Sequence, residues 1–466
     1  MPFYSPLTAA QEQSLCAAMD ALFPRQVAAL QEQIRFESVK CPPADGLPFG
    51  RDMQRSLDHV LALCNSFGLC TRDLDGYVGI ADYGQGAETL GILAHLDVVP
   101  AGTGWRFPPF SAQIHEGRLF GRGTTDDKGP ALCALFALAA IIQAGIPLSR
   151  RVRMIFGCDE ESGWACMDRY NQTEEAPTLA FSPDAEYPLV FSERAIVQAT
   201  YRLQAENTRL SIHAGERSNV VPGTAVAILP GDISLEMPFP TGSVCDGFTV
   251  ELTKQADALR IQVEGKNAHA STPESGKNAL QYLLKLLNGL PLPAADAKIV
   301  KTLYDAFQLD MHGETLGLDT TDYSGRLTLN PGILHMEQGE ATLTIDARLP
   351  AALAPSDLLA RIAAVLSPAG FAQTATHLHP GHFMPEDSEL VQKLLGVYRA
   401  QTGDTQSRPL AIGGGTYARA FPIAVGFGCE FPDTPMRAHM PDENISLEEL
   451  KTNTRIMADA ILALAR

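Results

Sequence analysis

A histidine and an aspartate lie two residues apart where an apolar stretch ends, in the segment Gly91–Pro100. Side chains of a strand alternate between its two faces, so His95 and Asp97 project to the same side. An imidazole and a carboxylate placed in this way suit a metal ligand and the group that fixes its tautomer. For such a pair taken alone, a hydrogen-bonded core histidine is the commoner outcome. The rest of the chain must therefore decide between the two.

Four further polar segments carry residue types that bind divalent metals. They contain Asp126 and Asp127 before an apolar stretch, Glu160 and Glu161 after residues 152–156, Asp184 after Ser182, and His439 near the C-terminus. Adjacent carboxylates most often form a solvated loop, but open α/β sheets place their ligands at strand ends. Imidazole and carboxylate ligands suit zinc or a comparable ion, and two ions that share a carboxylate form a hydrolytic site.

The composition argues against two classes of partner. The chain has 466 residues and a formal net charge of -18, with 54 acidic against 36 basic residues. A nucleic acid or an anionic membrane surface would need a basic face, so we expect neither as a partner. The most apolar stretch, residues 131–143, is too short to span a bilayer. Nine cysteines without a C-x-x-C pair, and a first segment that lacks a secretion signal, favour a cytoplasmic location.

Hydrophobic patterns place the polar segments on an α/β fold up to about residue 190. They predict helices over 8–33, 51–67 and 129–144 and strands over 89–99, 151–157 and 178–182. The pattern resumes after about residue 385, with a helix over 389–398 and a last helix over 446–464 that begins with a capping box at Ser446. We expect one crevice at the strand ends to gather the polar segments.

Between these two parts the pattern changes to alternating strands, for example over 248–253, 259–264 and 341–346. Two helices are predicted there, over 278–289 and 356–366, the second capped by Ser356 after Pro355. We therefore predict an α/β catalytic domain with a mixed, mostly parallel sheet, formed by residues 1–190 and 385–466. An inserted α+β domain over residues 191–384 interrupts it.

With all five polar segments in view, the chain resembles the co-catalytic zinc metallopeptidase family of aminoacylases, carnosinases and glutamate carboxypeptidases, most closely its bacterial PepV-type dipeptidases. The successive signatures of the family are matched in order by His95-Leu-Asp97, Gly121-Arg-Gly through Gly129, Asp159-Glu-Glu-Ser-Gly163, Ser182-Pro-Asp-Ala-Glu186 and Ala438-His-Met-Pro-Asp-Glu443. Any one match is weak, whereas five in order over nearly the whole chain are specific. The resemblance implies that the inserted domain is a lid with two α+β halves.

The resemblance also implies a set of metal ligands. His95 and Asp184 would hold one ion, Glu161 and His439 would hold the other, and Asp126 would bridge them. Two divalent ions are expected, zinc first, with manganese or cobalt as alternatives because these ions share such ligands. A metal-free acidic cluster is disfavoured, since repulsion among the carboxylates would raise their pKa values unless a cation compensated.

Two residues beside the metals receive roles from the same resemblance. Glu160 would be the general base, because it lies next to the ions without binding them and can take a proton from the attacking water. Asp97 would orient the imidazole of His95 without binding the metal itself. The peptide bond between Asp126 and Asp127 is expected to be cis, which would aim the bridging carboxylate between the ions.

Three residues of the inserted segment resemble lid residues that meet the substrate. His269 would stabilise the oxyanion when the lid closes, although a histidine after a strand is also common in turns. Asn219 and Arg348 would contact the substrate, Arg348 through the substrate carboxylate in a bidentate pair. Arg348 could instead be a surface arginine at the end of a strand.

A glycine-rich segment, Gly413–Arg419, lacks the lysine of a phosphate-binding loop, so no nucleotide is expected. It resembles the PepV-type segment that lines the substrate pocket. There Gly414, Gly415 and Thr416 would let backbone N–H groups approach a terminal carboxylate.

The resemblance therefore implies a dipeptidase that hydrolyses short unblocked peptides by attack of a metal-bridging hydroxide. An N-acyl-amino-acid amidohydrolase with the same site is one alternative. A non-catalytic peptide-binding relative is another, although the presence of Glu160 argues against it. The insertion, about 190 residues long, exceeds the single small lid that dimerises in shorter relatives. We therefore expect a monomer whose lid covers its own active site.

Overall fold

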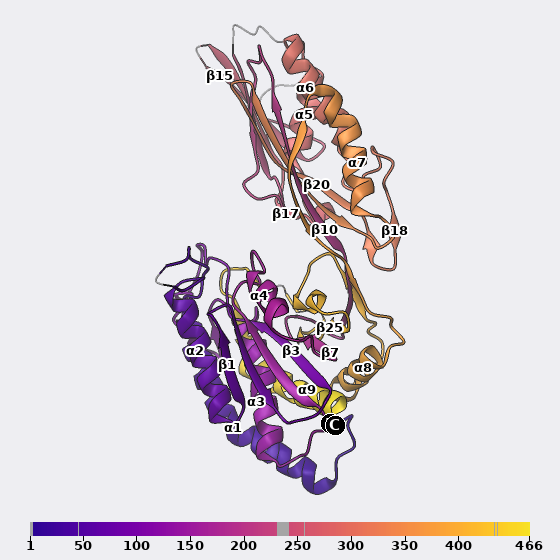
Figure 1. The fold of residues 1–466 in the computed structure, drawn as a ribbon. Helices are drawn as coiled ribbons and strands as arrows, with labels where there is room; N and C mark the ends of the chain where they lie inside the picture. The colour runs from indigo at the N-terminus through magenta and orange to yellow at the C-terminus, as the bar shows by residue number, and fades with distance from the viewer. Residues whose placement is uncertain (1–2, 45, 231–241, 256, 433, 436) are drawn as a thin grey trace. The chain divides into compact units, whose positions relative to one another are not determined.

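The computed structural model describes residues 3–44, 46–230, 242–255, 257–432, 434–435 and 437–466. The chain forms two compact units (Figure 1). Unit 1 comprises Met1–Ser192, His382–Leu410 and Gly415–Arg466, and unit 2 comprises Glu193–Gly381 and Ala411–Gly414. Among the helices of the described residues, none combines the length and the apolar character that crossing a membrane requires.

Unit 1 is built on a mixed sheet. Its central path runs β1 (Cys70–Leu74), β2 (Val78–Tyr83), β6 (Arg151–Gly157), β3 (Thr89–His95), β7 (Leu179–Ser182), β25 (Ala424–Gly426). β3 pairs in parallel with β6 and β7, and β7 pairs in parallel with β25, whereas β1, β2 and β6 are antiparallel to one another in turn. Every residue of β3 is buried, which explains its continuous apolar run.

Helices cover both faces of this sheet. α1 (Ala9–Arg35), α3 (Lys128–Gln143) and α9 (Leu447–Ala465) pack together on one face, with α2 (Arg51–Ser66) against β1 and β2. α4 (Ala165–Thr173) and Tyr417 belong to a smaller core on the other face. α3 is buried along nearly its whole length, and its small and aliphatic residues allow neighbours on all sides. The predicted capping box at Ser446 is confirmed at the start of α9.

Unit 2 contains a nine-stranded sheet with helices α5 (Ala279–Asn288), α6 (Ala294–Phe307) and α7 (Pro355–Leu366) in the same core (Figure 1). The strands follow the order β14 (Ser243–Cys245), β15 (Phe248–Gln255), β16 (Ala258–Glu264), β13 (Thr224–Pro230), β11 (Ser211–Ala214), β20 (Thr328–Glu337), β21 (Glu340–Leu349), β10 (Ala195–Gln204), β22 (Ala372–His379). Burial alternates along β13, as expected for a sheet with one face in the core.

Three local predictions were wrong or incomplete. β3 ends at His95 rather than at residue 99. Ser356 is not a cap, because Ala354 is the N-cap of α7 and Pro355 occupies the first helical position, where its missing N–H costs nothing. α6 was not predicted, although Ile299, Val300 and Leu303 repeat at helical spacing.

Candidate metal centre

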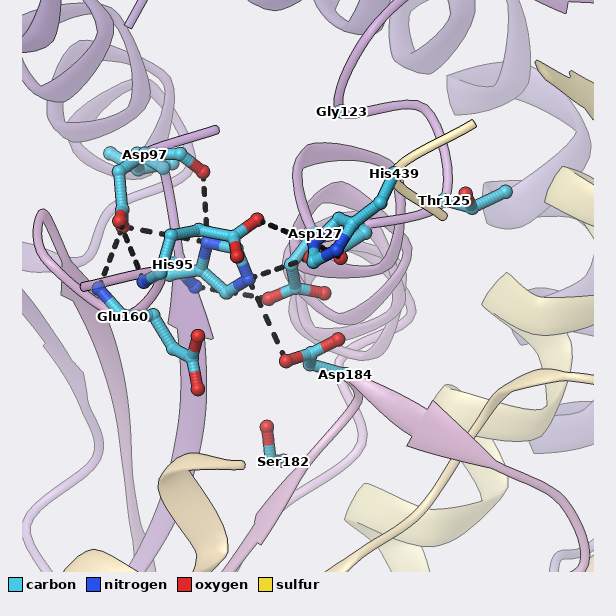
Figure 2. Close-up of polar contacts among 12 residues, drawn as sticks. His95, Asp97, Gly123, Thr125, Asp127, Glu160, Ser182, Asp184 and His439 are labelled. Carbon is cyan, nitrogen blue, oxygen red and sulfur yellow. Dashed lines mark hydrogen bonds and ion pairs between the residues drawn. The ribbon is translucent and has the colours of Figure 1, made fainter. Parts of the chain in front are cut away.

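His95 is the last residue of β3, and its side chain is buried. Its Nδ1 lies 2.9 Å from the main-chain carbonyl oxygen of Asp97. A carbonyl only accepts, so Nδ1 is the donor in this contact, and Nε2 faces Asp126 and Asp184 in the interior of the site. The carboxylate Oδ1 of Asp97 is farther away, at 3.5 Å from Nδ1. The main chain of Asp97 therefore makes the closer contact with the ring (Figure 2).

The carboxylate of Asp97 holds a different part of the site. Oδ1 accepts the N–H of Glu160 at 3.0 Å, and Oδ2 accepts the N–H of Glu161 at 2.9 Å. Asp97 thus fixes the loop that follows β6 and carries both glutamates. Sequence reasoning missed this contact, since nothing in the local pattern links residue 97 to residues 160 and 161.

Asp126 lies between two imidazoles. Its Oδ1 is 2.9 Å from Nε2 of His95, and its Oδ2 is 3.0 Å from Nε2 of His439. The peptide bond to Asp127 is cis, as predicted. Asp127 is buried, and its Oδ2 accepts the main-chain N–H of His95 at 3.0 Å. The loop before α3 therefore contacts β3 through both carboxylates and His439 through Asp126 alone.

Glu161 and Asp184 complete two groups of potential ligand atoms. Oε1 of Glu161 is 3.1 Å from Nε2 of His439, and Oδ2 of Asp184 is 3.6 Å from Nε2 of His95. The ligand atoms of His95, Asp126 and Asp184 all lie within 4.8 Å of one another, as do those of Asp126, Glu161 and His439. All five predicted metal ligands thus come together, and Asp126 belongs to both groups.

The carboxylates of the site lie close enough together to need a positive charge among them. Burial raises the pKa of Glu161 to about 7, with a further contribution from Asp126. Burial lowers the pKa of His439, but contacts with Asp126 and Glu161 outweigh it and raise the value to about 11. Carboxylates packed this closely require protons or a cation among them. In the metal-free protein the protonated imidazole of His439 supplies that charge.

Two further observations show that these residues fit divalent metal ions. Nε2 of His95 is buried and has no hydrogen-bond partner of acceptable geometry among the described residues, as a nitrogen reserved for a metal would be. The donor set of two imidazoles and three carboxylates is one that zinc and similar ions accept.

Glu160 belongs to neither group of potential ligands among the described residues. Burial raises the pKa of its carboxyl group well above the usual value, and the neighbouring Asp184 and Glu161 add to this while His95 opposes it. Figure 2 shows its side chain beside His95, in the same site as Asp184. A carboxylate with a raised pKa near bound substrate can accept and return a proton.

The predicted lid residues lie in unit 2. His269 in β17 (Ala268–His269) pairs with Val220 of β12 (Val220–Val221), and its Nδ1 is 2.6 Å from Oγ of Ser271. The carbonyl oxygen of Asn219 accepts the N–H of Ala270 at 2.9 Å. The contacts of this strand pair therefore bring His269 and Asn219 close together.

Arg348 is buried at the end of β21 and is engaged on two sides. Its Nε and Nη2 donate to the carboxylate of Asp346 at 2.7 and 3.1 Å, and its Nη1 donates to the carbonyl oxygen of Gly413 at 2.9 Å. It is thus no surface arginine. It anchors the first glycine of the segment that was predicted to line the substrate pocket.

The rest of that segment has identifiable local roles. A Cβ on Gly415 would lie 2.2 Å from the guanidinium of Arg419, so a larger residue would displace that side chain. Thr416 caps the short helix Tyr417–Ala420 by accepting the N–H of Ala418 at 3.1 Å. Gly414 groups with unit 2, whereas Gly415 and Thr416 group with unit 1.

Comparison with known proteins places this site in a family. Peptidase family M20/M25/M40 matches residues 91–463. "Putative dipeptidase YtjP" of Bacillus subtilis (strain 168) is 36% identical over 449 residues, covering 94% of this chain and 96% of the relative. "Putative dipeptidase SAUSA300_1697" of Staphylococcus aureus (strain USA300) is 34% identical over 453 residues, covering 93% and 96%.

Solved structures share the fold at low sequence identity. Human carnosine dipeptidase 1 aligns with a TM-score of 0.59 and 16% identity, over 98% of this chain and 99% of that one. The dipeptidase Dug1p from Saccharomyces cerevisiae aligns with a TM-score of 0.59 and 15% identity over the same shares. The family match spans the segments that carry all five potential ligands, and metallopeptidases of this kind use divalent ions. The chain belongs to peptidase family M20/M25/M40.

Proposed function

We propose that this protein is a metal-dependent dipeptidase that hydrolyses short peptides with a free amino terminus. The relatives that cover nearly the whole chain carry dipeptidase names, which supports this substrate class. One observation supports a two-metal site above all others. The two oxygens of Asp126 face two different imidazoles, each accompanied by a second carboxylate. Two sets of ligands that share one carboxylate are typical of hydrolases with two catalytic metal ions.

In this proposal His95 and Asp184 would hold one ion, Glu161 and His439 would hold the other, and Asp126 would be shared by both. Zinc is our first choice because the donors are imidazole nitrogen and carboxylate oxygen. Bound ions of this kind polarise a carbonyl group and make water a nucleophile at neutral pH.

Glu160 is the proposed general base. Its raised pKa lets it take a proton from the attacking water and later donate it to the departing amine. Asp97 sets the position of this base by holding the main-chain N–H groups of Glu160 and Glu161. The base and one metal ligand are therefore placed by the same carboxylate.

We further propose that unit 2 acts as a lid over the site in a cytoplasmic monomer. His269 would donate to the oxyanion, and Asn219, which lies close to it, would contact the substrate. Arg348 would act on the substrate carboxylate together with Gly414, Gly415 and Thr416. Its link to the carbonyl of Gly413 ties this arginine to the glycine segment and supports a joint role.

A substrate panel tests this function. Metal-free protein would be reloaded with zinc, manganese or cobalt, and hydrolysis would be measured for dipeptides, tripeptides and N-acetylated amino acids. We expect turnover of unblocked dipeptides, with slower turnover of tripeptides and of acetylated amino acids. Preferential hydrolysis of acetylated amino acids would replace the proposal with an amidohydrolase, and hydrolysis of none of them would refute catalysis.

A further inference from the structure

Glu443 is a fully buried carboxylate that no step of the proposed mechanism uses. Its Oε1 accepts the N–H of Gly123 at 3.0 Å and the N–H of Thr125 at 2.9 Å, and the hydroxyl of Thr125 at 3.1 Å. The N–H of Asp126 lies 3.3 Å from the same oxygen. Gly123 and Thr125 are labelled in Figure 2, on the loop that leads to the bridging aspartate.

The second oxygen of Glu443 forms a buried ion pair. Oε2 is 2.6 Å from Nη1 of Arg122, and both side chains are almost inaccessible to solvent, at 0% and 2% exposed. Burying an ion pair costs hydration, and further hydrogen bonds to the charged groups offset that cost. Here the four contacts from residues 123–126 satisfy the carboxylate. The guanidinium lies 5.1 Å from the ring centre of Trp105.

The same residues join two loops that are distant in sequence. β5 (Arg118–Phe120) pairs antiparallel with β27 (Asn444–Ser446), and the N–H of Gly121 donates to the carbonyl oxygen of Glu443 at 2.9 Å. The loop that follows β5 carries Asp126, and the loop that precedes β27 carries His439. Glu443 thus lies where the loops of two metal ligands leave their shared pair of strands.

We propose that Glu443, neutralised by Arg122, is a positioning residue that sets the separation of Asp126 and His439. His439 needs such an anchor, because its side chain is 53% exposed and it lies in a turn with φ of 63°. His95, by contrast, ends a central strand that is buried along its whole length. The inference rests on the proposed two-metal function, since metal ligands must be held within about half an ångström of their working positions.

This proposal predicts unequal loss of the two ions. Glu443→Gln keeps the shape of the side chain but replaces one carboxylate oxygen, an acceptor, with an amide nitrogen, a donor that faces Arg122. The contact that joins the loops of Asp126 and His439 is therefore weakened. The ion held by Glu161 and His439 should then bind roughly 10- to 100-fold more weakly, the range typical for residues that support ligands. The ion held by His95 and Asp184 should weaken less, because Asp126 is the one ligand of that ion on a loop that Glu443 holds, whereas Asp126 and His439 both serve the other ion.

Cobalt titration of the metal-free full-length protein measures both affinities, because bound cobalt reports its coordination in its visible spectrum. The matched control is Asp82→Asn, which breaks another largely buried ion pair of unit 1, between Asp82 and Arg153 at 2.8 Å. Arg153 lies near the start of β6, whereas the loop of Glu160 follows its end. This control should lower the melting temperature but leave both cobalt affinities as in the parent.

The outcomes separate a positioning role from general stability. The proposal is supported if Glu443→Gln weakens the binding of one cobalt ion more than that of the other and Asp82→Asn weakens neither. Parental affinity at both sites, or equal weakening in both variants, overturns it. If Glu443→Gln does not fold, Thr125→Val removes one donor to the same oxygen, and it must show a smaller loss at the same ion.

The result is independent of peptide turnover. If the parent binds two cobalt ions but hydrolyses no dipeptide, the proposed substrate fails while the positioning role can still be decided. If the parent binds fewer than two ions, the two-metal function itself fails, and the positioning role with it.

Discussion

Glu160 and Glu161 are adjacent in the sequence, yet their surroundings give the two carboxylates different tasks. Both main-chain N–H groups are held by Asp97, which fixes the backbone that carries the two side chains. Glu161 reaches Nε2 of His439 at 3.1 Å, while Glu160 stays outside both groups of potential ligands in the described chain. One residue of the pair can therefore bind metal while the other transfers protons.

Glu160→Gln should lower kcat by roughly 10²- to 10⁴-fold or more, because an amide cannot accept the proton of the attacking water. Metal content should stay at the parental level, since Glu160 is no proposed ligand. Steady-state kinetics combined with elemental analysis checks both statements. Glu161→Gln is the matched control, and it should lose metal as well as activity. Near-parental activity in Glu160→Gln would remove Glu160 from its role as base.

Metal affinity should rise with pH. In the metal-free protein the raised pKa of His439, about 11, means that this imidazole holds a proton at neutral pH, and a metal ion must displace it. Below about pH 7 Glu161 also becomes protonated, because burial raises its pKa to about 7. Affinity should therefore fall more steeply with decreasing pH below that value than above it.

Calorimetric titration with zinc in two buffers of different ionisation enthalpy measures the protons released. We expect more protons released per ion at pH 6 than at pH 8, and weaker binding at pH 6. Equal affinities at the two pH values would show that neither His439 nor Glu161 gives up a proton when the metal binds.

At the scale of elements, three neighbouring parallel strands deliver most of the site. β6, β3 and β7 are adjacent in the sheet, so their carboxyl ends lie at one edge. His95 ends β3, Glu161 follows β6, and Asp184 follows β7. Asp126 instead lies on the loop before α3, so its position depends on how closely that helix packs against the loop.

Gly129 in the first turn of α3 makes this packing possible. A Cβ at this position would lie 2.0 Å from the carbonyl oxygen of Thr124, a main-chain atom that cannot move cheaply. Gly129→Ala should therefore shift the loop of Asp126, lower the free energy of unfolding by about 1–3 kcal/mol and weaken metal binding. Chemical denaturation and metal titration measure the two effects.

Gly396→Ala is the matched control for that substitution, also within a helix, α8 (Glu389–Thr402). The three atoms nearest to its Cβ would all belong to the ring end of Tyr4, which is 45% exposed and can turn away. The stability of this variant should equal or slightly exceed that of the parent, because alanine stabilises a helix relative to glycine. Unchanged metal affinity in Gly129→Ala would show that the loop tolerates the shift.

At the scale of the whole molecule, the question is whether one chain supplies both the metals and the lid residues. Unit 2 is a large insertion with its own nine-stranded sheet and its own core. We predict that His269, Asn219 and Arg348 of this unit act on the metal site of the same chain, as in a monomeric enzyme.

Mixing two inactive variants tests this arrangement. In a monomer, His269→Ala and Glu160→Ala proteins together should show no more activity than the sum of the two alone. Recovery of substantial activity would mean that the lid of one chain serves the metals of another. Sedimentation velocity of the parent protein gives the oligomeric state directly, and a dimer there would also contradict the prediction.

The sequence by itself predicted the residues that converge and the mixed α/β architecture around them. Five short motifs contain His95, Asp126, Glu161, Asp184 and His439, and apolar periodicity located most of the helices and strands that hold them. The elements follow from local spacing, whereas the choice of these five residues as ligands came from the resemblance of the ordered motifs to a known family. The cis peptide after Asp126 was expected from family resemblance and is present.

Contacts between distant segments were decided only by the tertiary structure. The carboxylate of Asp97 holds the loop at residues 160–161, more than sixty positions away, and Glu443 meets Arg122 across a separation of 321 residues. No local pattern encodes such pairs, because a buried carboxylate finds its donors only when the chain has folded around it. The helix cap wrongly assigned to Ser356 has a similar cause, since backbone geometry at Ala354 and Pro355 decided where the helix begins.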